Sequence, residues 1–322
     1  MTVLVLTASD DRTATRVCDA LDDRDVDHQR MDLGDFPNSL SLTAVGPGPE
    51  WRGWISNSGH ELPLSEITAV YYRRPSSFRF PEHLPAQHRR FVAAEARQGW
   101  AGLLSCMRVP FVNRPSRIAD AELKLAQLQT AAEVGFRVPP TVITSAVGEA
   151  RAFVRGEREV IYKPLSAAFL RENGEARLMY ATLLRPDDLD DPTIGAQIAL
   201  SPCQYQRFIR KRHDVRLTAV GDRCFAAAIH AGSEQAYWDW RADYPSLSYE
   251  PVPTPEPIAA AVAAYLERFG LSFGCFDFTV AADTGDWWFL ECGPNAQWGW
   301  IEHETGQPIA AAIAALLAGE TT

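Results

Sequence analysis

Lysine is unusually scarce in this sequence. Lys124, Lys163 and Lys211 are its only lysines among 31 lysine and arginine residues. Arginine therefore occupies nearly every other cationic position. An ammonium group is a compact point charge, whereas a guanidinium group is a planar fork, so the two do not serve equally well against a phosphate. We interpret the retained lysines as candidates for phosphate contact.

Several signals of membrane or nucleic-acid association are missing. There is no run of 18 or more apolar residues, so no transmembrane helix is predicted. The N-terminal stretch MTVLVLTASDD has no basic leader and does not resemble a signal peptide. The net charge is −10 and no block of lysine and arginine occurs, which argues against a nucleic-acid groove or an anionic membrane as partner. We expect a cytoplasmic protein.

Metal and dinucleotide motifs are missing too. None of the six cysteines forms a CxxC pair, and no histidine cluster has zinc spacing. Scattered reduced thiols are typical of a cytosolic enzyme. The first strand-like segment is not followed by G-x-G-x-x-G, so the sequence does not predict a dinucleotide-binding domain.

The patterns that are present predict an α/β protein of several lobes. A chain of 322 residues exceeds the usual size of one domain. The segment TVLVLTA, a helix and a second strand form a βαβ opening. We divide the chain into an N-terminal domain of residues 1–114, a central lid subdomain of residues 115–185 and a C-terminal lobe of residues 186–322.

The local patterns after residue 114 predict helices, strands and one long loop. Pro115 opens a helix that Gly135 ends, and residues 164–178 have a loop-like composition. The segment EVIYKPL is a strand. A helix is expected over residues 255–269, and GCFDFTV pairs with WWFLEC through the turn ADTGD.

Two acids stand on this last predicted hairpin. Asp277 alternates with Phe276 and Phe278 and should point to the opposite face. Glu291 ends the neighbouring strand, so the two carboxylates can lie opposite one another. Two such carboxylates repel unless a cation lies between them, and Mg²⁺ is a suitable cation. The plainer alternative is that Asp277 caps a turn and Glu291 pairs with a surface arginine.

The cationic and linker segments admit similar pairs of interpretations. Lys163 follows a predicted buried strand, where a charge is costly unless it meets an anion such as a triphosphate. The alternative is an ordinary charge at the edge of the strand. Lys124 by itself suits a solvated helix surface. In QYQRFIRKRHDVR, Asp214 and Arg216 share one face of a strand. They suit a ribose and a phosphate, or an ordinary charged hairpin.

Taken in order, these segments resemble the ATP-grasp superfamily from about residue 113 to residue 318. The resemblance implies that Asp277 and Glu291 hold Mg²⁺, with Asn295 as the nearest amide for a third ligand because Gly293 stands where the usual pattern has an asparagine. It also implies a glycine-rich lid loop, in which this chain has only Gly174. The residues implied for ATP are Lys124, Lys163, Gln206, Arg207, Phe208, Ile209 and Asp214.

Within that superfamily, VYYRRPSSF, VNRPS, YKPL and LECGPNAQWGWIE resemble the graspetide synthetases. These enzymes phosphorylate Asp or Glu side chains of a ribosomal precursor peptide and cyclise them onto Ser or Thr hydroxyls or Lys amines. The resemblance implies ATP and Mg²⁺ as cofactors and a precursor peptide with leader and core as partner. Arg216 and Arg241 would act in catalysis. Arg73 and Arg74 would meet the peptide, and the plainer alternative is that both face solvent. A homodimer is compatible with the sequence.

Two other functions remain open from the sequence. One is a different ATP-grasp carboxylate–amine ligase that acts on a peptide or a protein tail. The other is a peptide-binding protein with an inactive nucleotide site, for which Gly293 is the reason. A cluster of aromatic residues suits either a peptide-lined cleft or ordinary core packing. These residues are Tyr237, Trp238, Trp240, Trp298 and Trp300.

Overall fold

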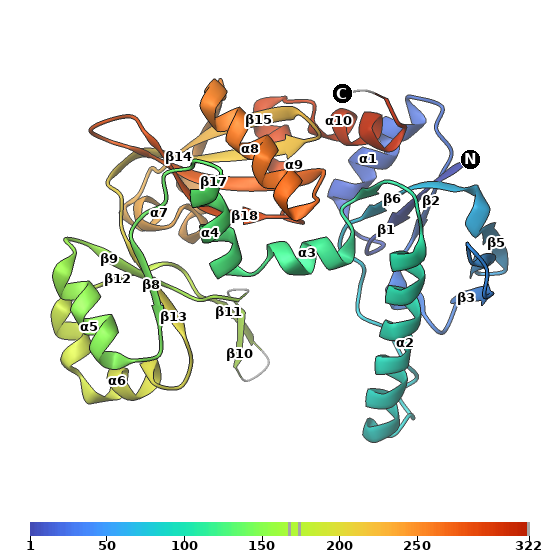
Figure 1. Ribbon diagram of the computed structural model, residues 1–322, viewed down its shortest axis with the longest axis horizontal. Helices are drawn as coiled ribbons and strands as arrows, with labels where there is room; N and C mark the ends of the chain where they lie inside the picture. The colour runs from blue at the N-terminus through green and yellow to red at the C-terminus, as the bar shows by residue number, and fades with distance from the viewer. Residues whose placement is uncertain (167–168, 173–174, 321–322) are drawn as a thin grey trace.

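The computed structural model describes residues 1–166, 169–172 and 175–320. The chain forms three parts: an N-terminal domain at one end, a large sheet with covering helices, and a smaller sheet below the large one (Figure 1). Gly174, the glycine expected in the lid loop, lies outside the described residues. No helix within the described ranges combines the length and the apolar character that a membrane crossing requires.

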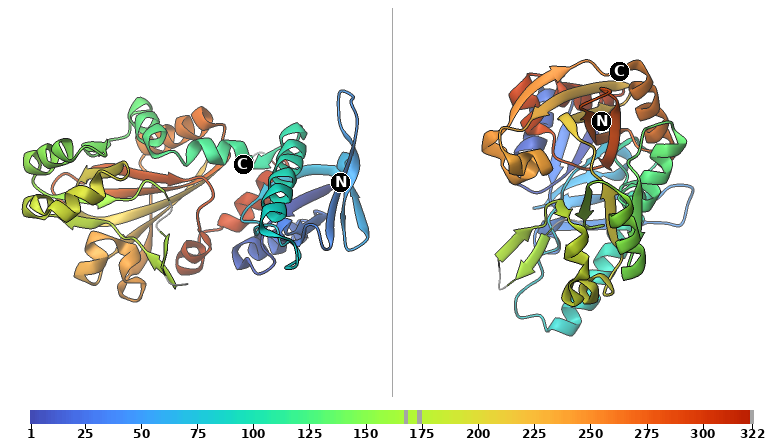
Figure 2. Two further views of the ribbon diagram at one scale, coloured as in Figure 1. Left: turned by 90° about the horizontal axis from the view of Figure 1, so that it is seen from below. Right: turned by 90° about the vertical axis from the view of Figure 1, so that its left-hand side faces the viewer.

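The N-terminal domain is built on a parallel sheet in the order β2-β1-β6-β7. The apolar run of β1 is fully buried, as the predicted βαβ opening requires. An antiparallel sheet β3-β4-β5 projects from it (Figure 2). The elements are β1 (Thr2–Leu6), α1 (Arg12–Asp22), β2 (His28–Met31), β3 (Leu40–Val45), β4 (Arg52–Asn57), β5 (His60–Pro63), β6 (Ile67–Tyr72), α2 (Ala86–Cys106) and β7 (Phe111–Val112).

A helical connection follows, and it corrects one expectation. Two helices, α3 (Pro115–Ala121) and α4 (Lys124–Glu133), replace the single helix predicted from Pro115 to Gly135. The chain leaves helical geometry at Leu123, which has φ −72° and ψ 109°. Lys124 thereby becomes the first residue of α4 rather than a residue within a helix.

The small sheet has the order β12-β9-β13-β8 and carries two helices on one side. Its elements pack mainly on one another. Residues 164–178, expected as a loop, contain a β-hairpin of β10 and β11 instead. The elements are β8 (Thr141–Thr144), α5 (Val147–Gly156), β9 (Val160–Lys163), β10 (Phe169–Glu172), β11 (Glu175–Leu178), β12 (Thr182–Leu184), α6 (Pro192–Ile198) and β13 (Cys203–Arg207).

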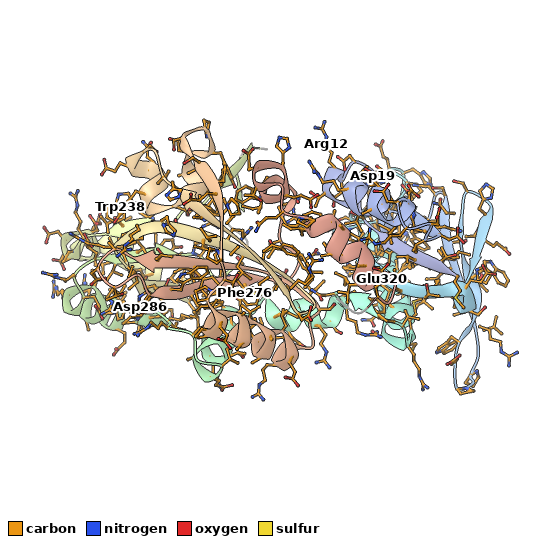
Figure 3. The ribbon with its side chains drawn as sticks, turned by 90° about the horizontal axis from the view of Figure 1, so that it is seen from above. Arg12, Asp19, Trp238, Phe276, Asp286 and Glu320 are labelled. Carbon is orange, nitrogen blue, oxygen red and sulfur yellow. The ribbon has the colours of Figure 1, made fainter. Side chains whose placement is uncertain are left out.

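The large sheet is antiparallel, with the order β16-β15-β14-β17-β18. The predicted helix over 255–269 and the β17–β18 hairpin are confirmed. Phe276 lies on a strand inside this body, while Arg12 and Asp19 lie on α1, in the part of the N-terminal domain that adjoins it (Figure 3). The elements are β14 (Lys211–Val220), β15 (Arg223–His230), α7 (Glu234–Trp238), β16 (Ser248–Val252), α8 (Glu256–Phe269), β17 (Phe273–Ala281), β18 (Trp287–Gly293), α9 (Gly299–Thr305) and α10 (Ile309–Leu317).

The two faces of the large sheet belong to different cores. Val215, Phe276 and Phe278 pack against α4 and α8. On the other face, Cys275 joins a core that also includes Val3 of β1 and residues of α1 and α10. The N-terminal domain and the large sheet therefore share one apolar core, and their relative position is set by it.

Candidate active site

A cleft of about 810 Å³ lies between the small and large sheets. All three lysines of the chain line it. Its lining has seven cationic and five acidic side chains, whereas the chain as a whole has a net charge of −10. The scarce lysines and the local positive charge make this the place where an anionic ligand is favoured. The charged lining residues are Arg74, Glu122, Lys124, Lys163, Arg207, Lys211, Asp214, Arg216, Asp239, Arg241, Asp277 and Glu291.

The two acids of the predicted hairpin lie opposite one another. Asp277 of β17 pairs in register with Glu291 of β18, and both line the cleft. Arg216 Nη1 donates to both carboxylate oxygens of Asp277 at 2.7 Å each. Burial raises the pKa of Asp277 to about 6, although Arg216 opposes the rise. The expected face for Asp277, opposite Phe276 and Phe278, is confirmed.

Glu291 is held ionised by cations from two other elements. Lys124 Nζ donates to its Oε2, and Arg241 Nη1 lies 3.9 Å from its Oε1. The Lys124 ammonium holds the pKa of Glu291 far below its usual range, although burial opposes this. The alternative in which Glu291 pairs with an ordinary surface arginine does not describe this site, because the main partner is the first residue of α4.

The donor set fits a hard divalent cation. Two carboxylates face one cleft, and such oxygen ligands suit Mg²⁺. A third ligand from Asn295 stays a prediction: its Oδ1 accepts from Arg73 Nη1 at 3.3 Å and its amide donates to the Arg73 carbonyl. Gly293 cannot carry a larger residue unaided, because a Cβ there would lie 2.5 Å from the Ala296 Cβ.

Lys163 ends β9 at the opposite wall of the cleft. Its Nζ donates to Gln206 Oε1 at 2.9 Å, a neutral partner. Burial lowers the pKa of Lys163 to about 8, with Glu291 acting in the other direction. Gln206 in turn donates to Thr141 Oγ1 at 2.9 Å. Lys163 therefore points an incompletely compensated charge at the acids across the cleft.

The linker between the sheets contributes the remaining predicted nucleotide residues. Gln206, Arg207, Phe208 and Ile209 all line the cleft where β13 leads into β14. Lys211 Nζ donates to Asp214 Oδ2 at 2.5 Å, and both side chains are buried. The Lys211–Asp214 pair replaces the Asp214–Arg216 pair of the charged-hairpin alternative.

Arg73 corrects an expectation from the sequence. It was expected to meet a peptide or to face solvent, but its side chain is 1% exposed. It donates to the carbonyls of Asn295 and Ala296 at 3.0 and 2.9 Å and lies 3.6 Å from Asp11. A side chain so enclosed cannot reach a peptide, so Arg73 instead fixes the loop that follows β18.

Arg241 and the aromatic residues lie at the large-sheet side of the cleft. Arg241 Nε and Nη2 donate to Asp239 at 2.9 and 2.8 Å. Trp240 packs on Trp300 with ring centroids 5.4 Å apart and ring planes tilted by 35°. Trp298 does not join them, because it is fully buried in the core shared with the N-terminal domain. Trp238, Trp240 and Trp300 line the cleft.

The sequence did not predict several residues that shape the cleft. Asp239 orients Arg241 and also accepts from the Ala181 backbone at 3.0 Å. Gln127 donates to the Cys292 carbonyl at 2.8 Å and so holds the strand of Glu291 to α4. The scarcity of lysine was a signal for Lys211, but Gln127 and Asp239 carried none, because their contacts join distant parts of the chain.

The N-terminal part and the whole fold both match known proteins. Residues 2–119 match the family model of the MvdD pre-ATP grasp domain. A RiPP-associated ATP-grasp ligase of Chryseobacterium gregarium, solved with ADP and a leader and core peptide, has a TM-score of 0.91 at 23% identity, over 100% of this chain and 97% of that chain. A comparison with curated proteins gave no match.

Two macrocyclases of Microcystis aeruginosa are also similar. MdnC, solved with precursor peptide MdnA, has a TM-score of 0.86 at 25% identity, over 99% of this chain and 100% of that chain. MdnB has a TM-score of 0.80 at 26% identity, over 98% of each chain. The ATP-grasp fold and the resemblance to graspetide synthetases are confirmed.

Proposed function

We propose that this chain, an ATP-grasp protein with a pre-ATP-grasp domain of the MvdD type, is an ADP-forming ligase that closes rings in a ribosomal precursor peptide. The observation that carries the proposal is the cleft that the three lysines line together with Asp277 and Glu291. The similarity to macrocyclases that bind precursor peptides supports the peptide as substrate. We place the reaction in the cytoplasm, where ATP is supplied.

The chemistry is a phosphoryl transfer followed by an acyl transfer. A carboxylate oxygen of an Asp or Glu side chain attacks the γ-phosphorus of ATP, and the bond to the β-phosphate oxygen breaks to release ADP. A Ser or Thr hydroxyl or a Lys amine then attacks the acyl phosphate carbon. Phosphate leaves, and the proton of the nucleophile passes to solvent. The protein mainly positions the reactants and neutralises their charge.

The residues of the cleft divide this work between its walls. Lys124 and Lys163 would contact the phosphates, and the linker of Gln206, Arg207, Phe208 and Ile209 would hold the adenine. Asp214 would accept from the ribose hydroxyls, and Arg216 and Arg241 would stabilise the transferring group. Mg²⁺ bound by Asp277 and Glu291, with Asn295 as a third ligand, would supply neutralising charge to the phosphates.

The domain division is part of the same proposal. Residues 1–114 would form the pre-ATP-grasp domain, residues 115–185 the lid subdomain, and residues 186–322 the catalytic lobe. The β8 and β9 strands of the second segment pair with β13 of the third, so the small sheet draws on both segments. The homodimer stays a prediction.

Mass spectrometry with a co-expressed precursor peptide tests the function. The probe is a short peptide, encoded beside the gene, with Ser or Thr and Asp or Glu near its C-terminus. Ring closure removes one water, about 18 Da, for each ester or amide formed. Addition of residues to the peptide would instead support a ligase that extends a peptide or protein tail. Peptide binding with no ADP formation would support an inactive nucleotide site and overturn the proposal.

A further inference from the structure

Gln297 connects the N-terminal domain to the cleft through two different groups. Its side-chain Oε1 accepts from Thr13 Oγ1 at 3.1 Å and from Arg73 Nη2, and both donors belong to the N-terminal domain. Its main-chain carbonyl accepts from Arg216 Nη2 at 3.2 Å at the cleft. One residue therefore joins the N-terminal domain to an arginine that is proposed to act in the chemistry.

Thr13 has a fixed place at the start of α1. Asp11 caps this helix, and its Oδ1 accepts from Thr13 N at 2.9 Å and from Ala14 N at 3.2 Å. The helix also approaches the residues after β18 closely, because a Cβ at Gly299 would lie 2.8 Å from Thr13 Oγ1. The Thr13 hydroxyl therefore lies directly against the segment that carries Gln297.

The neighbours of Gln297 in the loop of residues 294–298 are held as well. Trp298 is fully buried in the core that the N-terminal domain shares with the large sheet. On the other side, Arg73 donates to the carbonyls of Asn295 and Ala296 at 3.0 and 2.9 Å. These contacts on both sides fix the direction in which the Gln297 carbonyl points.

Arg216 needs that carbonyl as a second point of attachment. Both of its hydrogen bonds to the Asp277 carboxylate, at 2.7 Å each, leave from the single nitrogen Nη1. This contact alone would let the guanidinium group pivot about Nη1. The bond from Nη2 to the Gln297 carbonyl removes the pivot and fixes the plane of the guanidinium group.

We propose that Gln297 is a positioning residue for the reaction and that Thr13 sets it from the N-terminal domain. The proposal rests on the proposed ligase function, in which Arg216 stabilises the transferring group. A displacement of about 1 Å caused by a change far from the chemistry can lower a rate about 100-fold. The N-terminal domain therefore contributes to the chemical step, although Thr13 itself lies outside the cleft.

Kinetics of ADP formation with the precursor peptide test the role of Thr13. Thr13→Val removes the hydroxyl and keeps the shape of the side chain, whereas Thr13→Ser keeps the hydroxyl. Thr13→Val should lower kcat about 3- to 10-fold, the usual effect of one lost hydrogen bond. The KM for ATP should not change, because other residues hold the nucleotide. Thr13→Ser should have the kcat of the wild type.

The matched control is Thr15→Val, which makes the same change at an exposed position of the same helix and should leave kcat unchanged. Wild-type kcat in Thr13→Val overturns the proposal. A raised KM for ATP with an unchanged kcat overturns it too, because Thr13 would then affect nucleotide binding and not the chemical step.

A double-mutant cycle separates positioning from a general loss of structure. Gln297→Leu should lower kcat more than Thr13→Val does, because it removes the acceptor of both Thr13 and Arg73. Thr13→Val added to Gln297→Leu should lower kcat no further, since Thr13 acts through Gln297. Additive losses would show that Thr13 acts by another route and would overturn the proposal.

Hydrogen exchange in the loop of residues 294–298 tests the positioning without turnover. Mass spectrometry should show faster exchange there in Thr13→Val than in the wild type, and no change in Thr15→Val. Equal exchange in Thr13→Val and the wild type overturns the hold of Thr13 on the loop. If no peptide supports ADP formation by the wild type, the proposed function fails, and the exchange result alone decides whether Thr13 holds the loop.

Discussion

The large and small sheets face one cleft, but they differ in whether their charged side chains have charged partners. On the large sheet, Asp277 is paired with Arg216 and Asp214 with Lys211, in both cases inside the structure. On the small sheet, Lys163 has the neutral Gln206 as its partner. Strand β17 is buried along its whole length, whereas the residues of β8 are all half-buried.

This difference indicates a division of labour between the two walls. A buried, mutually paired network is costly to rearrange, so the large sheet presents a preformed set of groups. The small sheet packs mainly on its own helices, and the ammonium group of Lys163 on it is hydrogen-bonded to a neutral side chain. We infer that the large sheet fixes the reaction geometry, while the small sheet supplies affinity for the phosphates.

The largest effect should come from Glu291 on the large sheet. Glu291→Ala removes a proposed Mg²⁺ ligand and should lower ADP formation by about 100- to 1,000-fold, the cost of losing one preorganised charge contact. Peptide binding should persist. The control is Glu122→Ala, an exposed acid that also lines the cleft. Full activity of Glu291→Ala in a coupled ADP assay would remove the metal assignment and the contrast between the walls.

The next effect concerns how the large sheet is anchored to the N-terminal domain. Arg73→Leu leaves Asp11 without its cation and the loop after β18 without its donors. Loss of one partner from such a buried charge cluster should lower the free energy of unfolding by about 3–5 kcal/mol. Urea denaturation measures it. Arg74→Leu, one residue on, should change stability by less than about 0.5 kcal/mol; equal losses in both variants would contradict the anchor.

A smaller, pH-dependent effect should appear on the small sheet. Because burial lowers the pKa of Lys163 to about 8, its ammonium is charged at pH 7 and largely neutral at pH 9. The affinity for ADP should therefore fall as pH rises, by up to about 10-fold between these values. Calorimetric titration measures it. Lys163→Arg stays charged, so this variant should bind ADP more weakly but with the same affinity at pH 7 and pH 9. If its ADP affinity falls with pH as in the wild type, another group is responsible for the pH dependence.

The smallest effect should come from the outer surface of the small sheet unit. Arg155 and Asp190 form an exposed pair 2.9 Å apart. Such pairs contribute about 0–1 kcal/mol because water and salt screen them. Arg155→Ala should hardly change thermal unfolding or ADP formation. A large loss of activity would show that the small unit is as tightly coupled to the chemistry as the large sheet.

Local sequence patterns predicted the parts of the site that lie on one hairpin. The alternation around Asp277 and the position of Glu291 at a strand end predicted their pairing, because side-chain direction in a strand has a period of two. The partners from other elements could not be foreseen. Lys124 and Arg73 reach the site across long sequence separations, and no local pattern encodes such contacts.

The misjudged elements have different causes. The break between α3 and α4 occurs at Leu123, with neither glycine nor proline to mark it, and the contacts of Gln127 with the Ala121 and Cys292 carbonyls accompany it. The hairpin of β10 and β11 was hidden by its mixed composition. At the break between α3 and α4, these tertiary contacts override local preference.

The concentration of all three lysines in one cleft has a practical consequence. An amine-directed label such as an acylating ester would meet few competing primary amines: these side chains and the terminal amino group. Lys211 is buried and Lys163 is partly shielded, so the extent of labelling at each residue would differ. A nucleotide bound in the cleft should lower the labelling of the lysines that it covers. The extent of labelling at each lysine would therefore report whether the cleft is occupied.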